Sequence, residues 1–180
     1  MSDLVLLGLS GSLRQGATNR KLLHEAARLF GPATFVEADL RFPLYDGDDE
    51  VARGIPAMVQ TLADQIAAAD AVVVSTPEYN AMLSGVLKNA LDWISRTEGN
   101  PWLDKPVAVM AAAAGRSGGV LALSSLRASI RAFQPRVLQG PDVAVAASGQ
   151  QFDDDGRLIS AQYTKSLSTL MEKLRVDVAR

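Results

Sequence analysis

Three short apolar runs constrain the fold of this chain more than any other feature. They occupy residues 4–9, 71–75 and 107–113, and each lacks the regular polar positions of a strand that faces water on one side. A continuous apolar run of this length is typical of a strand covered on both faces. The sequence therefore predicts a parallel sheet enclosed between two layers of helices.

Segments with helical spacing of apolar residues alternate with these runs. They cover residues 20–30, 55–69, 83–94, 120–133 and 163–174, while residues 33–38 suit an edge strand and residues 136–146 a last strand. This alternation predicts an α/β fold: one doubly wound, five-stranded parallel sheet with helices on both faces, in a single domain over residues 1–180. We expect residues 39–56, with their acidic stretch at 46–50, to form a solvated loop.

Composition excludes several kinds of site. The net charge of −2 gives no basic footprint for nucleic acid, and the absence of cysteine excludes disulfides, thiolate catalysis and cysteine metal ligands. The single histidine, His24, cannot build a multi-histidine zinc site, and we expect it on the exposed side of the first helix. We expect no metal and no membrane segment, and we predict a cytoplasmic protein because no signal peptide is visible.

A small, hydroxyl-rich loop at residues 10–19 joins the first apolar run to the first helix. Unpaired backbone N–H groups and the positive end of a helix dipole meet at such a junction, which suits a phosphate group. The loop offers three hydroxyls, one side-chain amide and one cation. The residues that we expect to contact the phosphate are Ser10, Ser12, Arg14, Thr18 and Asn19.

The spacing within the loop distinguishes between phosphate ligands. Gly8, Gly11 and Gly16 do not have the G-x-G-x-x-G spacing of a dinucleotide site. The pair Gly11 and Gly16 has the glycine spacing of a triphosphate loop, but Ala17 stands where its lysine belongs. The remaining groups suit a single terminal phosphate, such as that of FMN. An ordinary turn in which Thr18 or Asn19 caps the helix is the alternative.

Two long motifs resemble the NADPH-dependent FMN reductase family. The first is G-S-L-R-Q-G-A-T-N at residues 11–19, and the second is P-E-Y-N at 77–80 with G-V-L-K-N-A-L-D-W-I-S-R at 85–96. The stretch F-P-L-Y-D at 42–46 also resembles the connection that follows the second strand in this family. The likeness covers essentially the whole chain in order, and it implies a flavodoxin-like fold.

The resemblance also implies where FMN binds. The first loop would hold the phosphate through Ser12, Arg14, Thr18, Asn19 and the backbone amides around Gly16 and Ala17. Backbone groups of the second and third loops would lie along the isoalloxazine ring. Alanine replaces a common hydroxyl residue at Ala17 and Ala113, which predicts lower affinity for FMN. Tyr79 as a packing aromatic and Glu78 as a solvated charge remain alternatives. The ring-side residues implied are Pro77, Glu78, Tyr79, Asn80, Ala113 and Gly115.

The activity implied by the resemblance is an NAD(P)H-dependent reduction of small acceptors through FMN. Quinones, azo compounds, chromate and free flavin are the acceptors of the family, and no protein acid or base is obligatory. Arg96 and Arg116 are candidates for contacting anionic substrates, or they form surface salt bridges. Trp93 and Trp102 are candidates for the interface of a homodimer or homotetramer, or they pack in the core.

Two other functions are compatible with parts of this pattern. A flavodoxin-type electron carrier would bind FMN without turnover on NAD(P)H, but such carriers tend to be strongly acidic and this chain has a net charge of only −2. A phosphate-loop nucleotide hydrolase would bind ATP and would not be yellow. The colour of the purified protein and its turnover with NADPH and a quinone distinguish the reductase, the electron carrier and the nucleotide hydrolase.

Overall fold

The computed structural model describes residues 4–180, and its centre is a parallel sheet. All strand pairs are parallel, in the order β2-β1-β3-β4-β5, with β6 also beside β4. This order is that of the flavodoxin-like doubly wound fold, as predicted. The strands are β1 (Val5–Ser10), β2 (Thr34–Glu37), β3 (Ala71–Thr76), β4 (Pro106–Ala112), β5 (Arg136–Val137) and β6 (Val143–Val145).

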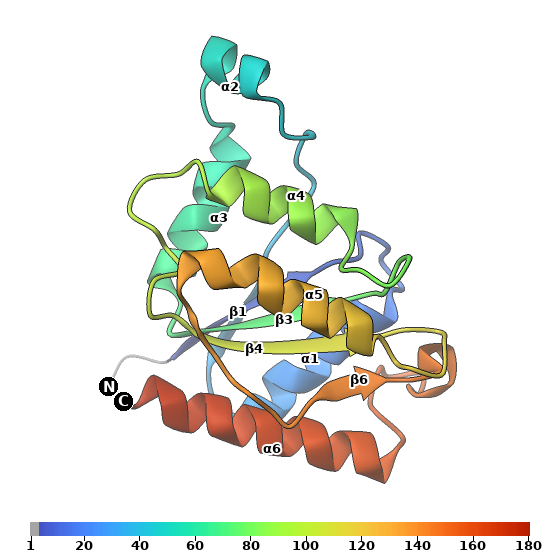
Figure 1. Ribbon diagram of the computed structural model, residues 1–180. Helices are drawn as coiled ribbons and strands as arrows, with labels where there is room; N and C mark the ends of the chain where they lie inside the picture. Colours follow the sequence, from blue (N-terminus) through green and yellow to red (C-terminus); the bar gives the residue numbers. More distant parts are fainter. Residues whose placement is uncertain (1–3) are drawn as a thin grey trace.

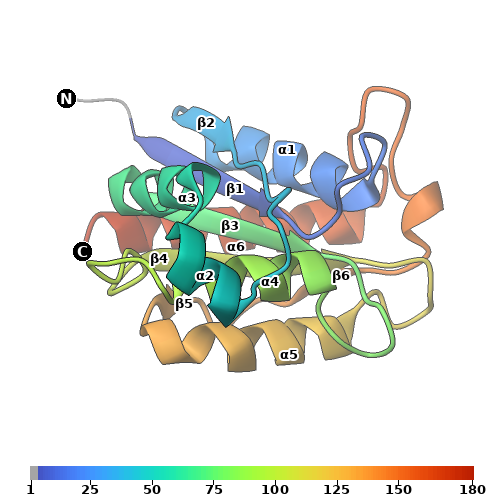
Figure 2. The ribbon, with the colours of Figure 1, turned by 90° about the horizontal axis from the view of Figure 1, so that it is seen from above.

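Helices cover both faces of the sheet. In Figure 1, α1 (Thr18–Phe30) and α6 (Ala161–Val178) lie below the strands, while α3 (Ala57–Ala68), α4 (Gly85–Ile94) and α5 (Val120–Ile130) lie above them. Figure 2 shows the same layers from above. The regular structure is completed by the short helix α2 (Gly47–Arg53) and by two short 3₁₀ helices, η1 (Arg131–Phe133) and η2 (Ser148–Gln150).

The predicted burial of the apolar runs on both faces is confirmed. Neighbouring residues of one strand point to opposite faces of a sheet. Leu7 and Leu9 therefore belong to the core beneath α3, α4 and α5, whereas Leu6 belongs to the core beneath α1 and α6. Val72 and Val73 divide between the two cores in the same way.

The last predicted strand is broken into two pieces, which share one edge of the predicted sheet. β5 pairs with β4 at Pro106 and Val107, and β6 pairs with the end of the same strand, so both lie along one edge. Pro141 in the intervening segment has no N–H to give to a sheet, and Gly140 has a φ of 143°. The chain therefore leaves the ladder between the two pieces.

The acidic segment at 46–50 forms a helix, so the prediction of a loop over residues 39–56 was wrong in part. Asp46 caps α2 (Gly47–Arg53) by accepting a hydrogen bond from the backbone N–H of Asp48, at 2.9 Å. Acidic residues in a first turn interact favourably with the helix dipole. No residue of α2 is buried, and the helix projects from the body of the protein (Figure 1).

The two tryptophans lie inside the core and not at an interface. Trp93 is 2% exposed and Trp102 is 1% exposed, so core packing, the alternative reading, is confirmed for both. The indole N–H of Trp93 donates to the backbone oxygen of Pro43 at 2.9 Å. This bond fastens the segment that leads to α2 onto α4.

The part of the chain that the structure describes holds neither a membrane-spanning helix nor a metal site. No helix within residues 4–180 is long and apolar enough to cross a bilayer. Over the same residues, no three histidine or acidic side chains gather closely enough to hold a metal ion. The acidic run that begins at Asp153 forms a turn, in which Gly156 donates its N–H to the oxygen of Asp153 at 3.0 Å.

Candidate functional site

A cleft of about 470 Å³ opens at the carboxyl ends of the strands. Ligands of doubly wound proteins bind at this edge, where the order of the strands reverses. Here β1 and β3 are neighbours, and the loops that follow β1, β3 and β4 meet η2. The lining residues are Ser12, Arg14, Gly16, Ala17, Thr18, Asn19, Lys21, Pro77, Glu78, Tyr79, Ala112, Ala113, Ala114, Ser148 and Gly149.

Three α-helices begin beside the cleft, and among these three only α1 begins without a side-chain cap. Its N-cap residue is Ala17, and no side chain accepts from its first amides. In contrast, the hydroxyl of Ser84 caps α4 and the carboxylate of Glu78 caps α5. The start of α1 therefore keeps the free N–H groups that bind an anion. The alternative in which Thr18 or Asn19 merely caps this helix is wrong.

Ser10 shapes the loop after β1 and does not line the cleft. Its hydroxyl donates to the backbone oxygen of Ser12 at 3.0 Å and accepts from the N–H of the same residue at 3.2 Å. Gly11 donates its N–H to the oxygen of Ser75, at 2.8 Å. A Cβ atom on Gly11 would lie 2.7 Å from the hydroxyl of Ser84, so only glycine permits this close approach. The loop is held tightly against β3 and α4.

The side-chain amide of Asn19 is engaged inside the protein. Asn19 is 3% exposed, and its Nδ2 donates to the oxygen of Ala112 at 2.9 Å. Its Oδ1 accepts from the hydroxyl of Ser75 at 2.8 Å and from the N–H of Ala112 at 3.0 Å. The expected contact of this amide with a phosphate is therefore corrected, because its donors and acceptor already join α1 to β3 and β4. The backbone N–H of Asn19 remains for a ligand.

Thr18 and Ser148 bring a distant part of the chain to the loop after β1. Their hydroxyl oxygens are 3.0 Å apart, although the residues are separated by 130 positions. Ser148, Gly149 and Lys21 line the cleft and were not predicted from the sequence. No local pattern could assign Ser148, because only the folding of β6 beside β4 carries it there. Lys21 adds a second cation to the exposed Arg14.

The loop after β3 turns sharply at the cleft. Tyr79 and Met82 exchange backbone hydrogen bonds at 3.1 Å, and the two residues between them have φ angles of 50° and 64°. Tyr79 lines the cleft and is 56% exposed, so it is not a packing aromatic. Asn80, at the tip of this turn, is exposed and does not line the cleft. Tyr79 therefore stands at the mouth of the cleft.

The loop after β4 contributes through its first residues. Ala113 and Ala114 line the cleft, and the N–H of Ala113 donates to the oxygen of Val145 at 3.1 Å. Gly115 and Arg116 are exposed and do not line it. Small side chains and backbone thus form this wall of the cleft. Ala113 lies in the wall, as predicted, whereas Gly115 does not.

Arg96 is not brought to the cleft. It follows the end of α4, whereas the cleft residues Pro77, Glu78 and Tyr79 precede the beginning of that helix. Its Nε donates to both carboxylate oxygens of Glu50, at 3.0 and 3.1 Å, and the hydroxyl of Tyr45 donates to the same carboxylate at 2.9 Å. These donors hold the pKa of Glu50 below its usual value. Within this chain Arg96 forms the surface salt bridge that was the alternative reading.

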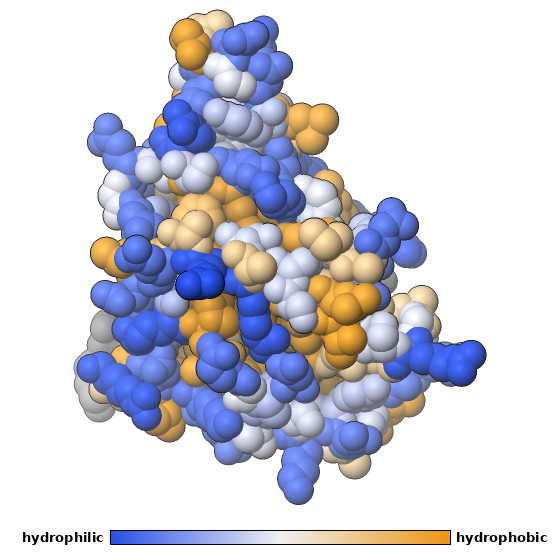
Figure 3. Space-filling model, viewed as in Figure 1, coloured by the Kyte–Doolittle hydropathy of each residue, from blue (hydrophilic) through white to orange (hydrophobic). Residues whose placement is uncertain are grey.

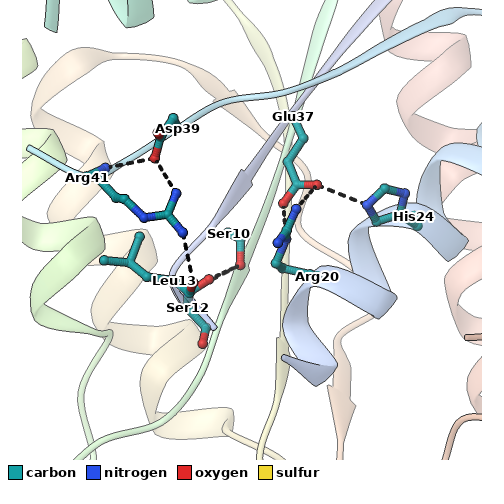
Figure 4. A network of polar contacts seen from close by, with 8 residues as sticks. All are labelled: Ser10, Ser12, Leu13, Arg20, His24, Glu37, Asp39 and Arg41. Atoms are coloured by element: carbon teal, nitrogen blue, oxygen red, sulfur yellow. Dashed lines mark hydrogen bonds and ion pairs between the residues drawn. The ribbon is translucent and has the colours of Figure 1, made fainter. Parts of the chain in front are cut away.

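A polar network supports the outer side of the loop that follows β1 (Figure 4). Arg20 donates to both carboxylate oxygens of Glu37, at 2.6 and 3.1 Å, and His24 lies 2.9 Å from the same group. Burial raises the pKa of Glu37, but its bonds to Arg20 and His24 outweigh burial and hold it below its ordinary value. Arg41 donates to the backbone oxygen of Leu13 at 3.1 Å. The network thus braces the loop after β1 from the side of β2.

Comparison with known proteins identifies the family. The family described as NADPH-dependent FMN reductase matches residues 4–150. An NAD(P)H-dependent FMN reductase of Pseudomonas aeruginosa is 39% identical over 99% of this chain and 97% of its own length, and a quinone reductase of Escherichia coli is 37% identical over 77% and 76%. The solved structure of FerB, a flavoenzyme NAD(P)H:(acceptor) oxidoreductase of Paracoccus denitrificans, superimposes with a TM-score of 0.87 at 27% identity, covering 98% of this chain and 97% of FerB. The chain belongs to the NADPH-dependent FMN reductase family.

Proposed function

We propose that this protein is an NAD(P)H-dependent oxidoreductase that binds FMN in the cleft and reduces quinones or similar small acceptors. The observation that carries the proposal is the uncapped start of α1 inside the cleft, in a chain whose relatives are named FMN and quinone reductases. FMN has one terminal phosphate, and the cleft offers one free helix start to receive it. The relatives do not favour the alternative of an electron carrier.

The donors at the start of α1 fit a phosphate monoester. The backbone amides of Thr18 and Asn19, the hydroxyls of Ser12 and Thr18, and the cation of Arg14 would hold it. Lys21 adds a second positive charge. Charged donors make stronger hydrogen bonds to anions than neutral donors do. Ala17 offers no hydroxyl, and its N–H already donates to the backbone oxygen of Arg14 at 3.2 Å, so it shapes the loop and adds no donor for the phosphate.

The walls formed by the second and third loops fit a flat ring. Pro77, Tyr79, Ala113 and Ala114 line this part of the cleft with apolar groups and backbone. Bound FMN would supply two-electron chemistry, taking hydride from NAD(P)H and passing it to the acceptor. The chain's own task is to bind and orient the reactants, and Glu78 is engaged with α5, so no side chain is proposed as an acid or base.

Arg116 remains the arginine proposed to contact an anionic substrate. It is exposed on the loop after β4, two residues beyond the last lining residue of that loop. Arg96 is the weaker of the two original candidates, because it is bound to Glu50 at the other end of α4. Substitution of Arg116 by alanine should raise the KM for NADPH and leave flavin affinity unchanged; an unchanged KM would remove it from the site.

We also propose a cytoplasmic homodimer or homotetramer. The support is an apolar surface over the beginning of α5 (Figure 3), where Val120 and Leu121 are 43% and 52% exposed, together with Met82 at 53%. Exposed apolar side chains that gather on one face mark interaction sites. Light scattering of the purified protein tests the assembly, and a monomeric mass at micromolar concentration would contradict it. Cell fractionation tests the location.

The flavin spectrum and a turnover assay test the activity. The purified protein is expected to be yellow, or to bind FMN when the cofactor is added to the deflavinated form. It should then oxidise NADPH with p-benzoquinone in the absence of any partner protein. Bound FMN without turnover would instead identify an electron carrier. ATP binding without flavin binding would identify a nucleotide hydrolase.

A further inference from the structure

Glu78 connects the two loops that form the ring end of the cleft. One carboxylate oxygen accepts from the backbone N–H of Leu121 at 3.0 Å and from that of Ala122 at 3.1 Å. The other lies 3.5 Å from the hydroxyl of Ser117, at the outer limit of a hydrogen bond. Glu78 belongs to the loop after β3, whereas its three partners follow β4. The side chain therefore bridges the two walls.

The start of α5 is built to receive this carboxylate. The N-cap position is Gly119, which has a φ of 99° and no side chain to cap the helix. A Cβ atom at this position would lie 2.8 Å from the Cβ of Ala111 and 3.8 Å from that of Glu78. The glycine thus both leaves the first amides of α5 open and allows the loop after β3 to approach. A carboxylate at a helix start gains from the hydrogen bonds and from the helix dipole.

Glu78 also lines the cleft, between Pro77 and Tyr79. Ala113 and Ala114 line it from the opposite loop. Movement of Glu78 away from α5 would therefore change the separation of these two walls. A second bond joins the loop after β3 to α5, since Ser125 accepts from the N–H of Leu83 at 2.7 Å, but neither residue lines the cleft.

We propose that Glu78 is a positioning residue, which sets the separation of the two ring-side walls by capping α5 from the opposite loop. This inference rests on the proposed function, because it concerns the part of the cleft assigned to the flavin ring. It assigns no chemistry to the carboxylate. Instead it makes the fit of the ring depend on a helix cap supplied by another segment of the chain.

Riboflavin, which lacks the phosphate, isolates the effect on the ring. Substitution of Glu78 by alanine should weaken riboflavin binding by roughly tenfold, because a charge-assisted tie between the walls is lost. The affinity of inorganic phosphate, measured by its competition with FMN, should not change. With FMN bound, the visible circular dichroism of the flavin should decrease, and the KM for p-benzoquinone should rise more than kcat falls. Glu78→Gln keeps one acceptor oxygen and should recover most of the riboflavin affinity.

Ser125→Ala is the matched control, because it removes the other bond between the same two segments. It should lower the melting temperature but change riboflavin affinity by less than about twofold. Equal loss of riboflavin and phosphate affinity in Glu78→Ala, or an equal effect of Ser125→Ala on riboflavin, would overturn the proposal. Should the alanine variant fail to fold, amide exchange at Leu121 and Ala122 in the wild-type protein decides: both amides should be protected by the cap from Glu78, and exchange at the rate of free amides there overturns the proposal. Failure of wild-type protein to bind FMN would instead refute the proposed function.

Discussion

Single side chains at the phosphate end of the cleft differ in what they can contribute. Arg14 is exposed and lines the cleft, so its guanidinium is available to a ligand at the surface. Asn19, in the first turn of α1, is buried and bonded to β3 and β4. Residues of one motif thus divide between binding a ligand and holding the loop in place.

Replacing Arg14 by alanine tests the phosphate contact. Loss of one charge-assisted hydrogen bond typically costs roughly 1.5–3 kcal/mol, so FMN affinity should fall by roughly ten- to a hundredfold. A fluorescence titration of the deflavinated protein measures this change. Riboflavin affinity should be unaltered, and Arg53→Ala, on the exposed helix α2, should leave both affinities at the wild-type value. Unchanged FMN affinity in Arg14→Ala would refute the role of this residue.

The sequence predicted part of the site at this scale. Ser12, Arg14 and Thr18 line the cleft because they belong to one short loop between a strand and a helix. The inward turn of Asn19 depends on the position of β4, 93 residues away, and could not be inferred from spacing. Ser148, whose hydroxyl lies beside that of Thr18, is 130 positions away and could not be inferred from spacing either. Local patterns locate a loop, but contacts between distant segments decide which way its side chains point.

At the scale of elements, the main point is how α1 is fastened to the sheet. Asn19 joins its first turn to β3 and β4, and Glu25 in its middle binds Arg28 and Arg157. Apolar packing against α6 covers the rest of its inner face. Since α1 supplies the free amides of the cleft, its position fixes where a phosphate can bind.

Asn19→Ala should therefore damage both stability and binding. The change leaves the hydroxyl of Ser75 and the backbone N–H and oxygen of Ala112 without their partner, and buried groups that lose a partner cost roughly 1–3 kcal/mol each. We expect the free energy of unfolding to fall by roughly 3 kcal/mol, measured by urea titration, and FMN to bind more weakly. A variant as stable as the wild type would show that the network is not needed.

The helix α2 is attached more weakly than the others, with no buried residue of its own. Arg96→Ala removes the ion pair to Glu50, which is its main polar contact with the body. Trypsin should then cleave α2 at Arg53 several times faster, because the segment unfolds locally more often. The melting temperature should change little, as expected for an exposed ion pair. Lys88→Ala, which removes an ion pair within α4, is the control and should leave the cleavage rate unchanged.

The sequence predicted the elements better than their ends. The apolar runs and helical spacing located every long helix and the three inner strands of the sheet, because burial on two faces leaves a clear pattern. The helix α2 was missed because its signal is a capping aspartate and three acidic residues, which also suit a loop. The break between β5 and β6 was missed because apolar residues continue on both sides of Pro141.

At the scale of the whole molecule, two buried or half-buried carboxylates link α1 to the rest of the fold. Glu25 of α1, whose side chain is 1% exposed, binds Arg157 in the segment between β6 and α6. Glu37, at the end of β2, binds Arg20 of α1. Burial raises the pKa of Glu25, but its bonds to Arg28 and Arg157 prevail and hold the pKa below its ordinary value of 4.5. The pKa of Glu37 is lowered in the same way by Arg20 and His24.

Acid should therefore destabilise this protein through these groups. A carboxyl whose pKa is lower in the folded state contributes stability that is fully present above its unfolded pKa and is lost as pH falls through the folded pKa. We expect the melting temperature to decline as pH falls below about 4.5. Glu25→Gln should be less stable at pH 7 and should lose less further stability between pH 4.5 and 3. Parallel pH profiles of variant and wild type would contradict this link.

The bond between Glu25 and Arg157 has a consequence for any shortened form of the protein. The match to the family ends at residue 150, yet Arg157 and the whole of α6 lie beyond that point. A protein truncated there would leave the carboxylate of Glu25 with one cation instead of two, and would expose the apolar face of α1 that Leu170 and Leu174 now cover. The boundary of the family match is therefore not the boundary of the folding unit. A minimal soluble fragment must retain α6.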